Sequence, residues 1–198
     1  MTDYCTIALV KTRLGITNTD DDTMLQDIVS EVSAWMDAYC NRPLYRDSDE
    51  TRYYDPLNDV FGTLLVFDGE LAVVTSVTVG GTLWASSDYI TQPRNRPPYR
   101  EMRLARASSK TWSDGSVTES SIVIVGRWCM IPSELDSRYD LLQGAAVALA
   151  MFVYREKDAG NNGDIVGILD AGLMMVDKGF PSGVAKRLQG WRRHGVAT

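Results

Sequence analysis

Residues 22–43, which read DTMLQDIVSEVSAWMDAYCNRP, decide how the rest of the chain is interpreted. Their apolar residues recur every three or four positions, the spacing that places side chains on one face of an α-helix. Arg42 and Pro43 end the run, because a residue before proline disfavours the helical backbone. The stretch therefore predicts a long amphipathic helix, with an apolar face made of Leu25, Ile28, Val29, Val32, Trp35, Met36 and Tyr39.

The residues before this helix predict its cap and a shorter helix in front of it. Thr19 and Asp22 are three positions apart, the pattern in which a hydroxyl and a carboxylate cap the first turn. The adjacent carboxylates also suit a hard cation, but no calcium-loop spacing follows them, so the cap is the preferred interpretation. A first short helix is expected from about Asp3 to Leu14, where Gly15 stops it.

From about Thr51 to Cys129 the apolar period changes to two, which predicts antiparallel strands. The clearest alternation is VVTSVTV at residues 73–79, between the turn pairs Asp68-Gly69 and Gly80-Gly81. Together the strands predict a small sheet inserted between helices. Further strands are expected at residues 64–67, 83–84, 89–90, 102–104 and 122–125.

A third helix is expected to open at Pro132 and Ser133, with Asp136 completing a second capping pattern. Residues 158–163 predict a flexible break, residues 165–176 are apolar without a clear period, and Pro181 starts a short helix that ends near Arg193. The expected inward positions of the third helix are Leu135, Tyr139, Leu142, Ala146, Leu149 and Val153.

The predicted fold class is α+β. A small α-helical bundle comprises the two N-terminal helices and the helix after Pro132, in residues 1–45 and 131–157. An antiparallel β-sheet lobe is inserted at residues 46–130, and a C-terminal extension, residues 158–198, ends in a basic helix.

Composition narrows the function classes. The 198 residues are 44% hydrophobic and 23% charged, as in a soluble globular protein, and no apolar run approaches the roughly 20 residues of a membrane span. A net charge of -6 argues against a protein that grips nucleic acid. The charge is polarised, because residues 1–60 hold 12 acids and five bases, whereas five bases and no acid follow from Lys178 onward.

No constellation of catalytic residues is found. The single histidine, His194, lies in the basic tail, and the glycine-rich phosphate-binding motifs are absent. The carboxylates Asp47, Asp49 and Glu50 lie in a polar connection where solvation leaves their acidity ordinary. We therefore expect no enzyme activity, no cofactor and no metal site. Three scattered cysteines are expected to be buried, reduced thiols: Cys5, Cys40 and Cys129.

Two basic segments are candidate contact sites. The arginines of residues 93–104 fit a loop that touches an acidic partner or nucleic acid, and they fit a solvated hairpin as well. In the tail, Leu188 and Trp191 can share one helical face ringed by cations, which suits either a docking peg or a segment folded back onto its own core. The loop candidates are Arg94, Arg96, Arg100 and Arg103; the tail candidates are Lys186, Arg187, Leu188, Trp191, Arg192 and Arg193.

The order of these elements resembles the gp6-like head-tail connector proteins of phages. The opening ALVKTRLGI at residues 8–16, the acidic residues 20–22 and the helix that ends in AYCNRPL at residues 38–44 carry the resemblance. VVTSVTVGG at residues 73–81, DYI at 88–90, IVIVGRW at 122–128 and IPSEL at 131–135 extend it, so that it covers about residues 5 to 157.

The resemblance implies a structural subunit of the virion neck that forms a ring, dodecameric in the family, under the portal protein. Such a ring extends the channel through which double-stranded DNA passes and offers a platform to a tail or stopper protein. The C-terminal segment is the expected portal contact, and the host cytoplasm is the expected place of assembly. An acidic channel would repel sliding phosphates, and its expected lining is Asp20, Asp21, Asp22, Asp47 and Asp49.

Two other classes are weighed. Another tail-completion or neck protein fits the same composition. A helical DNA-binding regulator fits less well, because the helix from Asp22 to Tyr39 carries acids and no base where a recognition helix needs Arg, Lys, Asn or Gln.

Overall fold

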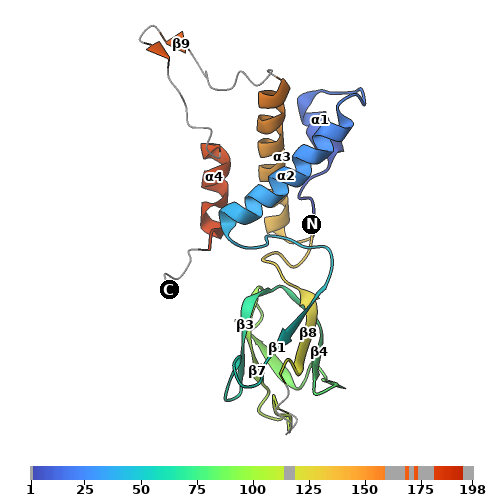
Figure 1. The fold of residues 1–198 in the computed structure, drawn as a ribbon, viewed down its shortest axis with the longest axis vertical. Helices are drawn as coiled ribbons and strands as arrows, with labels where there is room; N and C mark the ends of the chain where they lie inside the picture. The colour runs from blue at the N-terminus through green and yellow to red at the C-terminus, as the bar shows by residue number, and fades with distance from the viewer. Residues whose placement is uncertain (1, 114–118, 159–167, 170–171, 174–180, 194–198) are drawn as a thin grey trace. The chain divides into compact units, whose positions relative to one another are not determined.

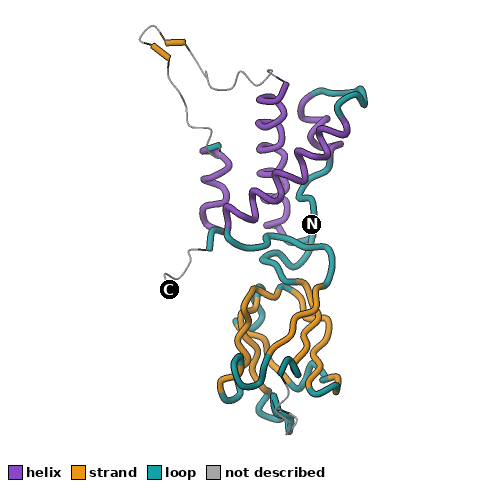
Figure 2. Tube along the Cα trace, viewed as in Figure 1, coloured by secondary structure: helices purple, strands orange, loops and turns teal. Residues whose placement is uncertain are grey.

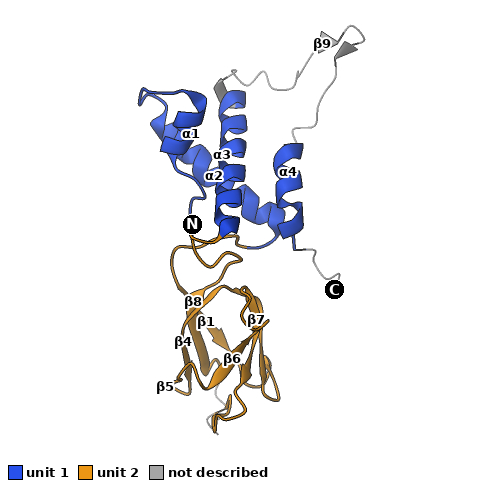
Figure 3. Ribbon diagram, turned by 180° about the vertical axis from the view of Figure 1, so that it is seen from behind, with its two compact units in different colours: residues 1–42, 137–198 blue, residues 43–136 orange. Residues whose placement is uncertain are grey.

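The computed structural model describes residues 2–113, 119–158, 168–169, 172–173 and 181–193 (Figure 1). The chain divides into two compact units, coloured separately in Figure 3. Residues 1–42 and 137–198 form a helical unit, and residues 43–136 form a β unit made of strands and loops (Figure 2). The α+β class is confirmed by these elements. The three-part domain division stays a prediction.

The helical unit begins with two helices, α1 (Ile7–Leu14) and α2 (Asp22–Cys40). The Thr6 hydroxyl accepts a hydrogen bond from the Leu9 amide at 3.4 Å and caps α1. Gly15 ends the helix as predicted, with a left-handed φ of 76° that suits glycine. The helix starts four residues later than expected, because residues 4 and 5 form a bend and Thr6 has an extended backbone at the cap position.

Helix α3 (Ser137–Asp158) packs against α1, α2 and α4 (Ser182–Leu188). In Figure 1 α2 crosses α3 on the viewer's side, with α1 and α4 flanking α3. A 3-10 turn, η1 (Gln189–Trp191), follows α4, and β9 (Ile168–Leu169) pairs with β10 (Gly172–Leu173). Small residues in the middle of α3 allow close packing. Its buried positions are Leu142, Ala145, Ala146, Val147, Leu149, Ala150, Val153 and Tyr154.

Two expected core residues lie outside the helical core. Helix α3 begins at Ser137 and not at Pro132, because residues 133–136 form a turn in which the Asp136 amide donates to the Ser133 carbonyl at 3.2 Å. Leu135 is therefore 97% exposed. Trp35 lies at the edge of the apolar face of α2 and is 45% exposed.

The β unit contains two antiparallel sheets of four strands, where one small sheet was expected. Their orders are β1-β8-β4-β5 and β2-β3-β7-β6. The strands are β1 (Glu50–Tyr54), β2 (Val60–Phe61), β3 (Leu64–Leu71), β4 (Val73–Val79), β5 (Thr82–Leu83), β6 (Tyr89–Gln92), β7 (Tyr99–Leu104) and β8 (Ile122–Arg127).

The pair Asp68-Gly69 lies inside β3 and does not form the predicted turn. The guanidinium of Arg52 passes over Gly69, where an added Cβ would lie 2.4 Å from Nη1 and would displace this flexible group. The register between β3 and β7 shifts between Val66 and Leu71, so this stretch is irregular without ending the strand.

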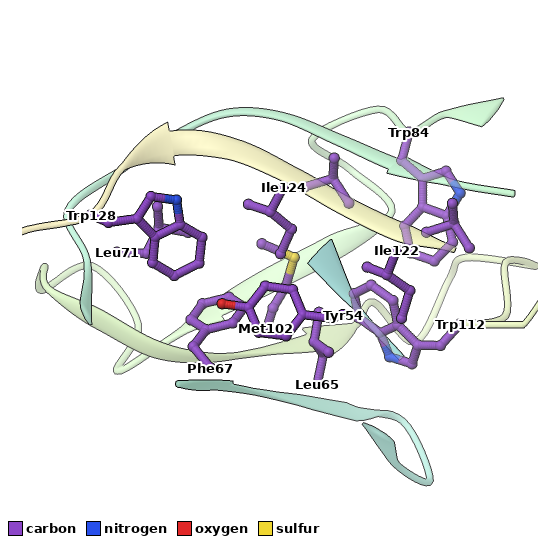
Figure 4. Close-up of a cluster of buried hydrophobic side chains, with 12 residues drawn as sticks. Tyr54, Leu65, Phe67, Leu71, Trp84, Met102, Trp112, Ile122, Ile124 and Trp128 are labelled. Atoms are coloured by element: carbon purple, nitrogen blue, oxygen red, sulfur yellow. The ribbon is translucent and has the colours of Figure 1, made fainter. Parts of the chain in front are cut away.

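The core of the β unit contains side chains from both sheets (Figure 4). Trp128, which follows β8, is 2% exposed, and its indole N–H donates to the Glu50 carbonyl at 3.1 Å. Its ring meets the ring of Phe67 edge-on at 5.3 Å between centroids. Truncating such a buried tryptophan costs about 3–5 kcal/mol, so this corner anchors the unit.

Candidate functional site

The acidic residues before α2 contact other segments and do not cap the helix. Asp21 occupies the cap position without a side-chain cap bond, so the predicted capping pattern is wrong. Tyr154 of α3 and Lys11 of α1 approach these carboxylates instead. Asp20 accepts from Asn18 at 2.8 Å, Asp21 from the Tyr154 hydroxyl at 2.8 Å, and Asp22 from Lys11 Nζ at 2.5 Å.

These contacts divide the predicted channel-lining residues. Asp21 and Asp22 are half-buried and hold α2 to its neighbouring helices, whereas Asp20 is exposed. Asp47 and Asp49 are exposed in the β unit, where Asp49 accepts from the Thr75 hydroxyl at 2.6 Å. The five residues therefore belong to two units, and their common channel stays a prediction.

The terminal basic segment is bound to the C-terminal end of α2. The backbone amide of Arg193 donates to the Cys40 carbonyl at 2.8 Å. The guanidinium of Arg42 donates to the Trp191 carbonyl through Nε at 2.6 Å and also through Nη2. The guanidinium of Arg192 lies 5.4 Å from the centre of the Tyr39 ring. Helix ends leave carbonyls without partners, and here a distant segment supplies one.

The side chains of this segment point to different environments. Leu188 is fully buried and Trp191 is half-buried, which matches the folded-back alternative for these two residues. The charged candidates Lys186, Arg187, Arg192 and Arg193 are exposed, so docking through them stays a prediction. His194 lies outside the described residues, as do most of residues 158–180, for which a flexible break and an apolar stretch were expected.

Arg42 was missed as a site residue, because its place before Pro43 suggested only the end of a helix. The residues that it joins are 149 positions apart, so local spacing carries no signal of the contact. The one hint in the sequence is the aromatic residue followed by arginine at the end of the helix, part of the family resemblance.

The four arginines of the basic loop are not equivalent. Arg94 and Arg96 are exposed between β6 and β7, and Arg103 is exposed on β7. Arg100 instead forms an ion pair at 2.9 Å with Glu70, a carboxylate that is 5% exposed. Partner contact by Arg94 and Arg96 stays a prediction, whereas Arg100 has a structural partner.

A second arginine, Arg52, stacks on the core tryptophan. Its guanidinium carbon lies 4.4 Å from the centre of the Trp128 ring, and it bonds Asp68 at 2.9 Å. Burial raises the pKa of the Asp68 carboxyl, but the hydrogen bond from Tyr54 at 2.8 Å and the Arg52 charge outweigh it and hold the pKa below its usual value. This network fixes β1 against β3.

The described residues also bear on the predictions about metal sites, thiols and membrane spans. Within these residues, no three His, Cys, Asp or Glu side chains are grouped to hold a metal ion. The three cysteines are free and buried as predicted. Burial raises the pKa of Cys5 to about 12 and that of Cys40 to about 11, so both thiols are protonated at neutral pH. A search of the described helices finds none with the length and apolar character to span a bilayer.

Residues 4–61 match the family model described as "Phage gp6-like head-tail connector protein". The predicted family resemblance is confirmed. The match covers α1, α2 and the first two strands, which is the N-terminal part of the stretch over which the resemblance to gp6-like connectors was seen. No curated protein matches the chain.

Two solved structures share the fold. A chain in "Neck of native GTA particle computed with C12 symmetry" is 16% identical, with a TM-score of 0.52, over 87% of this chain and 84% of that chain. A chain in "Neck of empty GTA particle computed with C6 symmetry" is 16% identical, with a TM-score of 0.56, over 96% of this chain and 90% of that chain. The likeness to these neck proteins extends over both units.

Proposed function

We propose that this chain is a non-enzymatic connector subunit of a virion neck, where it joins the portal of the head to the tail. The observation that carries the proposal is the match of residues 4–61 to the gp6-like head-tail connector family. The likeness of the fold to chains of two particle necks supports it. Assembly takes place in the host cytoplasm before the subunit becomes part of the virion.

The subunit forms a ring of twelve copies that extends the DNA channel. A neck computed with C12 symmetry contains one of the similar chains. The exposed carboxylates of Asp20, Asp47 and Asp49 are the strongest lining candidates, joined by the half-buried Asp21 and Asp22. Carboxylates along a channel repel phosphates, so DNA moves through without being captured.

The terminal segment is the surface that meets the portal. Its bonds to Cys40 and Arg42 hold the backbone in place while the cationic side chains face solvent. A segment that is already ordered loses less conformational freedom on binding, which favours affinity. The exposed arginines Arg94 and Arg96 of the β unit are the candidates for contact with an acidic tail or stopper protein.

The test is electron microscopy of the full chain mixed with portal-bearing heads. Wild type is expected to seat a ring on the portal, and the double variant Lys186→Glu with Arg193→Glu is expected to lose that seating. Arg106→Glu, at an exposed position of the β unit, is the matched charge-reversal control and should seat normally.

Three outcomes distinguish the proposed connector function from its alternatives. A wild-type protein that forms rings but never joins the portal is another neck or tail-completion protein. If the double variant seats on the portal as well as wild type does, the terminal segment is not the portal contact, and the connector function still stands. A wild type that binds duplex DNA sequence-specifically and does not bind the portal is a regulator. The absence of Lys and Arg from α2 argues against that class.

A further inference from the structure

An open groove follows α3 and is lined by residues of α1, α3 and α4. Figure 3 shows the backbone of α3 between α1 and α4, with α2 behind it. The groove consists of two hollows of about 590 Å³ and about 360 Å³. Both are lined by Ala148, Met151 and Arg187, so they are parts of one groove. Its floor includes Gly144, at which an added Cβ would meet nothing within 4 Å.

The lining of the groove is apolar with a cationic rim. Leu9 is 37% exposed and Phe152 is 39% exposed, although both are large apolar residues. Three arginines and one carboxylate carry the charge, and within the described residues none of the three arginines forms an ion pair. The charged lining residues are Arg13, Arg155, Arg187 and Asp140. Such a groove suits an acidic segment with a large apolar side chain.

The outer face of α2 has that chemistry. Trp35 is 45% exposed there, and the neighbouring Ala38 is exposed and small. Glu31 and Asp27 add negative charge about one and two turns before Trp35, respectively, and α2 contains no base. The residues that line the groove come from α1, α3, α4 and the start of the segment before α4, and none comes from α2, so the groove and the exposed side of α2 are separate surfaces of the helical unit.

We infer that the groove of one subunit receives the outer face of α2 of the next subunit, with the Trp35 indole inserted beside Met151 and Phe152. The occupant is a second copy because the acidic side of α2 complements the cationic rim in charge, and the exposed Trp35 matches the apolar lining. An arginine of the rim stacks on the indole, which adds a cation–π contact. Arg187 therefore serves the contact between copies, separately from Lys186 and Arg193 in the proposed portal contact.

The symmetry of this contact follows from its geometry. Each copy contributes two different surfaces, so the contact is head-to-tail and generates a closed ring when the rotation permits. A two-fold dimer would need one surface to bind itself, and neither the cationic groove nor the acidic helix face is complementary to itself. The inference rests on the proposed function for the ring, and it names the residues that close it.

Two variants each remove one half of the contact and leave the fold intact. Gly144→Glu fills the groove and adds a charge that repels the acidic helix; Gly144→Ala is its matched control. Ala38→Arg adds to the outer face of α2 a charge of the same sign as the groove rim. Both positions are exposed on helices, so circular dichroism spectra and melting temperatures should match those of the wild type or exceed them.

Self-association of the full chain is measured by sedimentation equilibrium up to the highest soluble concentration. Wild type and Gly144→Ala should associate, and each of the two blocking variants should weaken association at least about tenfold. A mixture of Gly144→Glu and Ala38→Arg should form a dimer with one copy of each that cannot grow, because one variant keeps the helix face and the other keeps the groove.

Several results would overturn the inference. They are a monomeric wild type, a Gly144→Glu variant that associates like the wild type, and a mixture that stays monomeric while wild type associates. If Gly144→Glu still seats rings on the portal, the interface is wrong and the connector function stands. If the mixed dimer forms but wild type never joins the portal, the interface stands and the connector function fails. An acidic partner protein that binds the groove of a monomeric wild type is then the occupant.

Discussion

Replacing Gly126 of β8 by alanine is expected to destabilise the β unit by about 2–4 kcal/mol. An added Cβ would lie 2.2 Å from the Val73 carbonyl oxygen and 2.8 Å from Cδ1 of Leu71. Val73 belongs to β4, which pairs with β8, so relief requires the ladder between these strands to open. Overpacking costs about 1–3 kcal/mol, and a weakened ladder hydrogen bond adds about 1 kcal/mol.

The same substitution at Gly144 provides a control of opposite sign. Gly144 lies in α3 with open space around it, so alanine there should stabilise the helical unit by about 0.8–1 kcal/mol through helix propensity. For a unit of about 100 residues, 1 kcal/mol moves Tm by about 4–8 °C. Gly126→Ala should therefore lower the Tm of the β unit by roughly 8–32 °C, and Gly144→Ala should raise the Tm of the helical unit by roughly 3–8 °C.

Urea unfolding separates the two units, because tryptophan fluorescence reports mainly on the β unit and far-ultraviolet circular dichroism reports on the helices. The β unit contains Trp84, Trp112 and Trp128, all buried. Gly126→Ala should shift the fluorescence transition to lower urea. A Gly126→Ala midpoint that matches that of the wild type would refute the argument from close packing.

Three further predictions concern single side chains. Arg42→Ala removes the guanidinium that holds the Trp191 carbonyl, so the amide of Arg193 should exchange with solvent at least about tenfold faster in hydrogen-exchange measurements; unchanged protection would contradict the anchoring. The folded-state pKa of Cys5, about 12, lies above its reference value of 9.0, so the thiol's contribution to the free energy of unfolding is complete below pH 9 and is lost as the pH rises toward 12. Cys5→Ala should therefore reduce the loss of stability at alkaline pH, measured as the urea midpoint. An equally steep loss in the variant would exclude the thiol as its cause. Arg100→Ala removes a charged hydrogen-bond donor from the buried carboxylate of Glu70 and should cost about 1–3 kcal/mol. Arg103→Ala, at an exposed position, should stay within about 0.5 kcal/mol, and equal costs would mean that the Arg100 ion pair contributes nothing.

The helical part of the fold was largely predictable because its signals are local. Leu25, Ile28, Val32 and Met36 are all buried as their spacing predicts. Trp35 was wrongly placed on the buried face of α2, because the spacing of apolar residues does not tell how much of the helix surface is buried.

Features that depend on contacts between distant segments were not predictable. Asp68-Gly69 has the composition of a turn, but it lies inside β3, where Asp68 binds Arg52 of another strand. The carboxylates of Asp21 and Asp22 have the composition of a cap, but they bind side chains of α3 and α1. In each case a tertiary partner decided the role of a residue whose local pattern indicated something else.

The assembly surfaces were predictable only in part for the same reason. The cations of the tail are visible in the sequence, but their attachment to α2 joins residues about 150 positions apart. The groove was not predicted at all, because it exists only where α1, α3 and α4 meet.

The helical unit is assembled from both ends of the described chain, whereas the β unit is one continuous segment. During synthesis residues 43–136 emerge from the ribosome as a complete folding unit, while α2 waits for α3 and for the segment that ends at Arg193. The surfaces proposed for ring closure and portal contact therefore exist only after translation has passed residue 193. A nascent chain cannot join a ring before that point, so the order of synthesis itself delays polymerisation until residue 193 is available for folding.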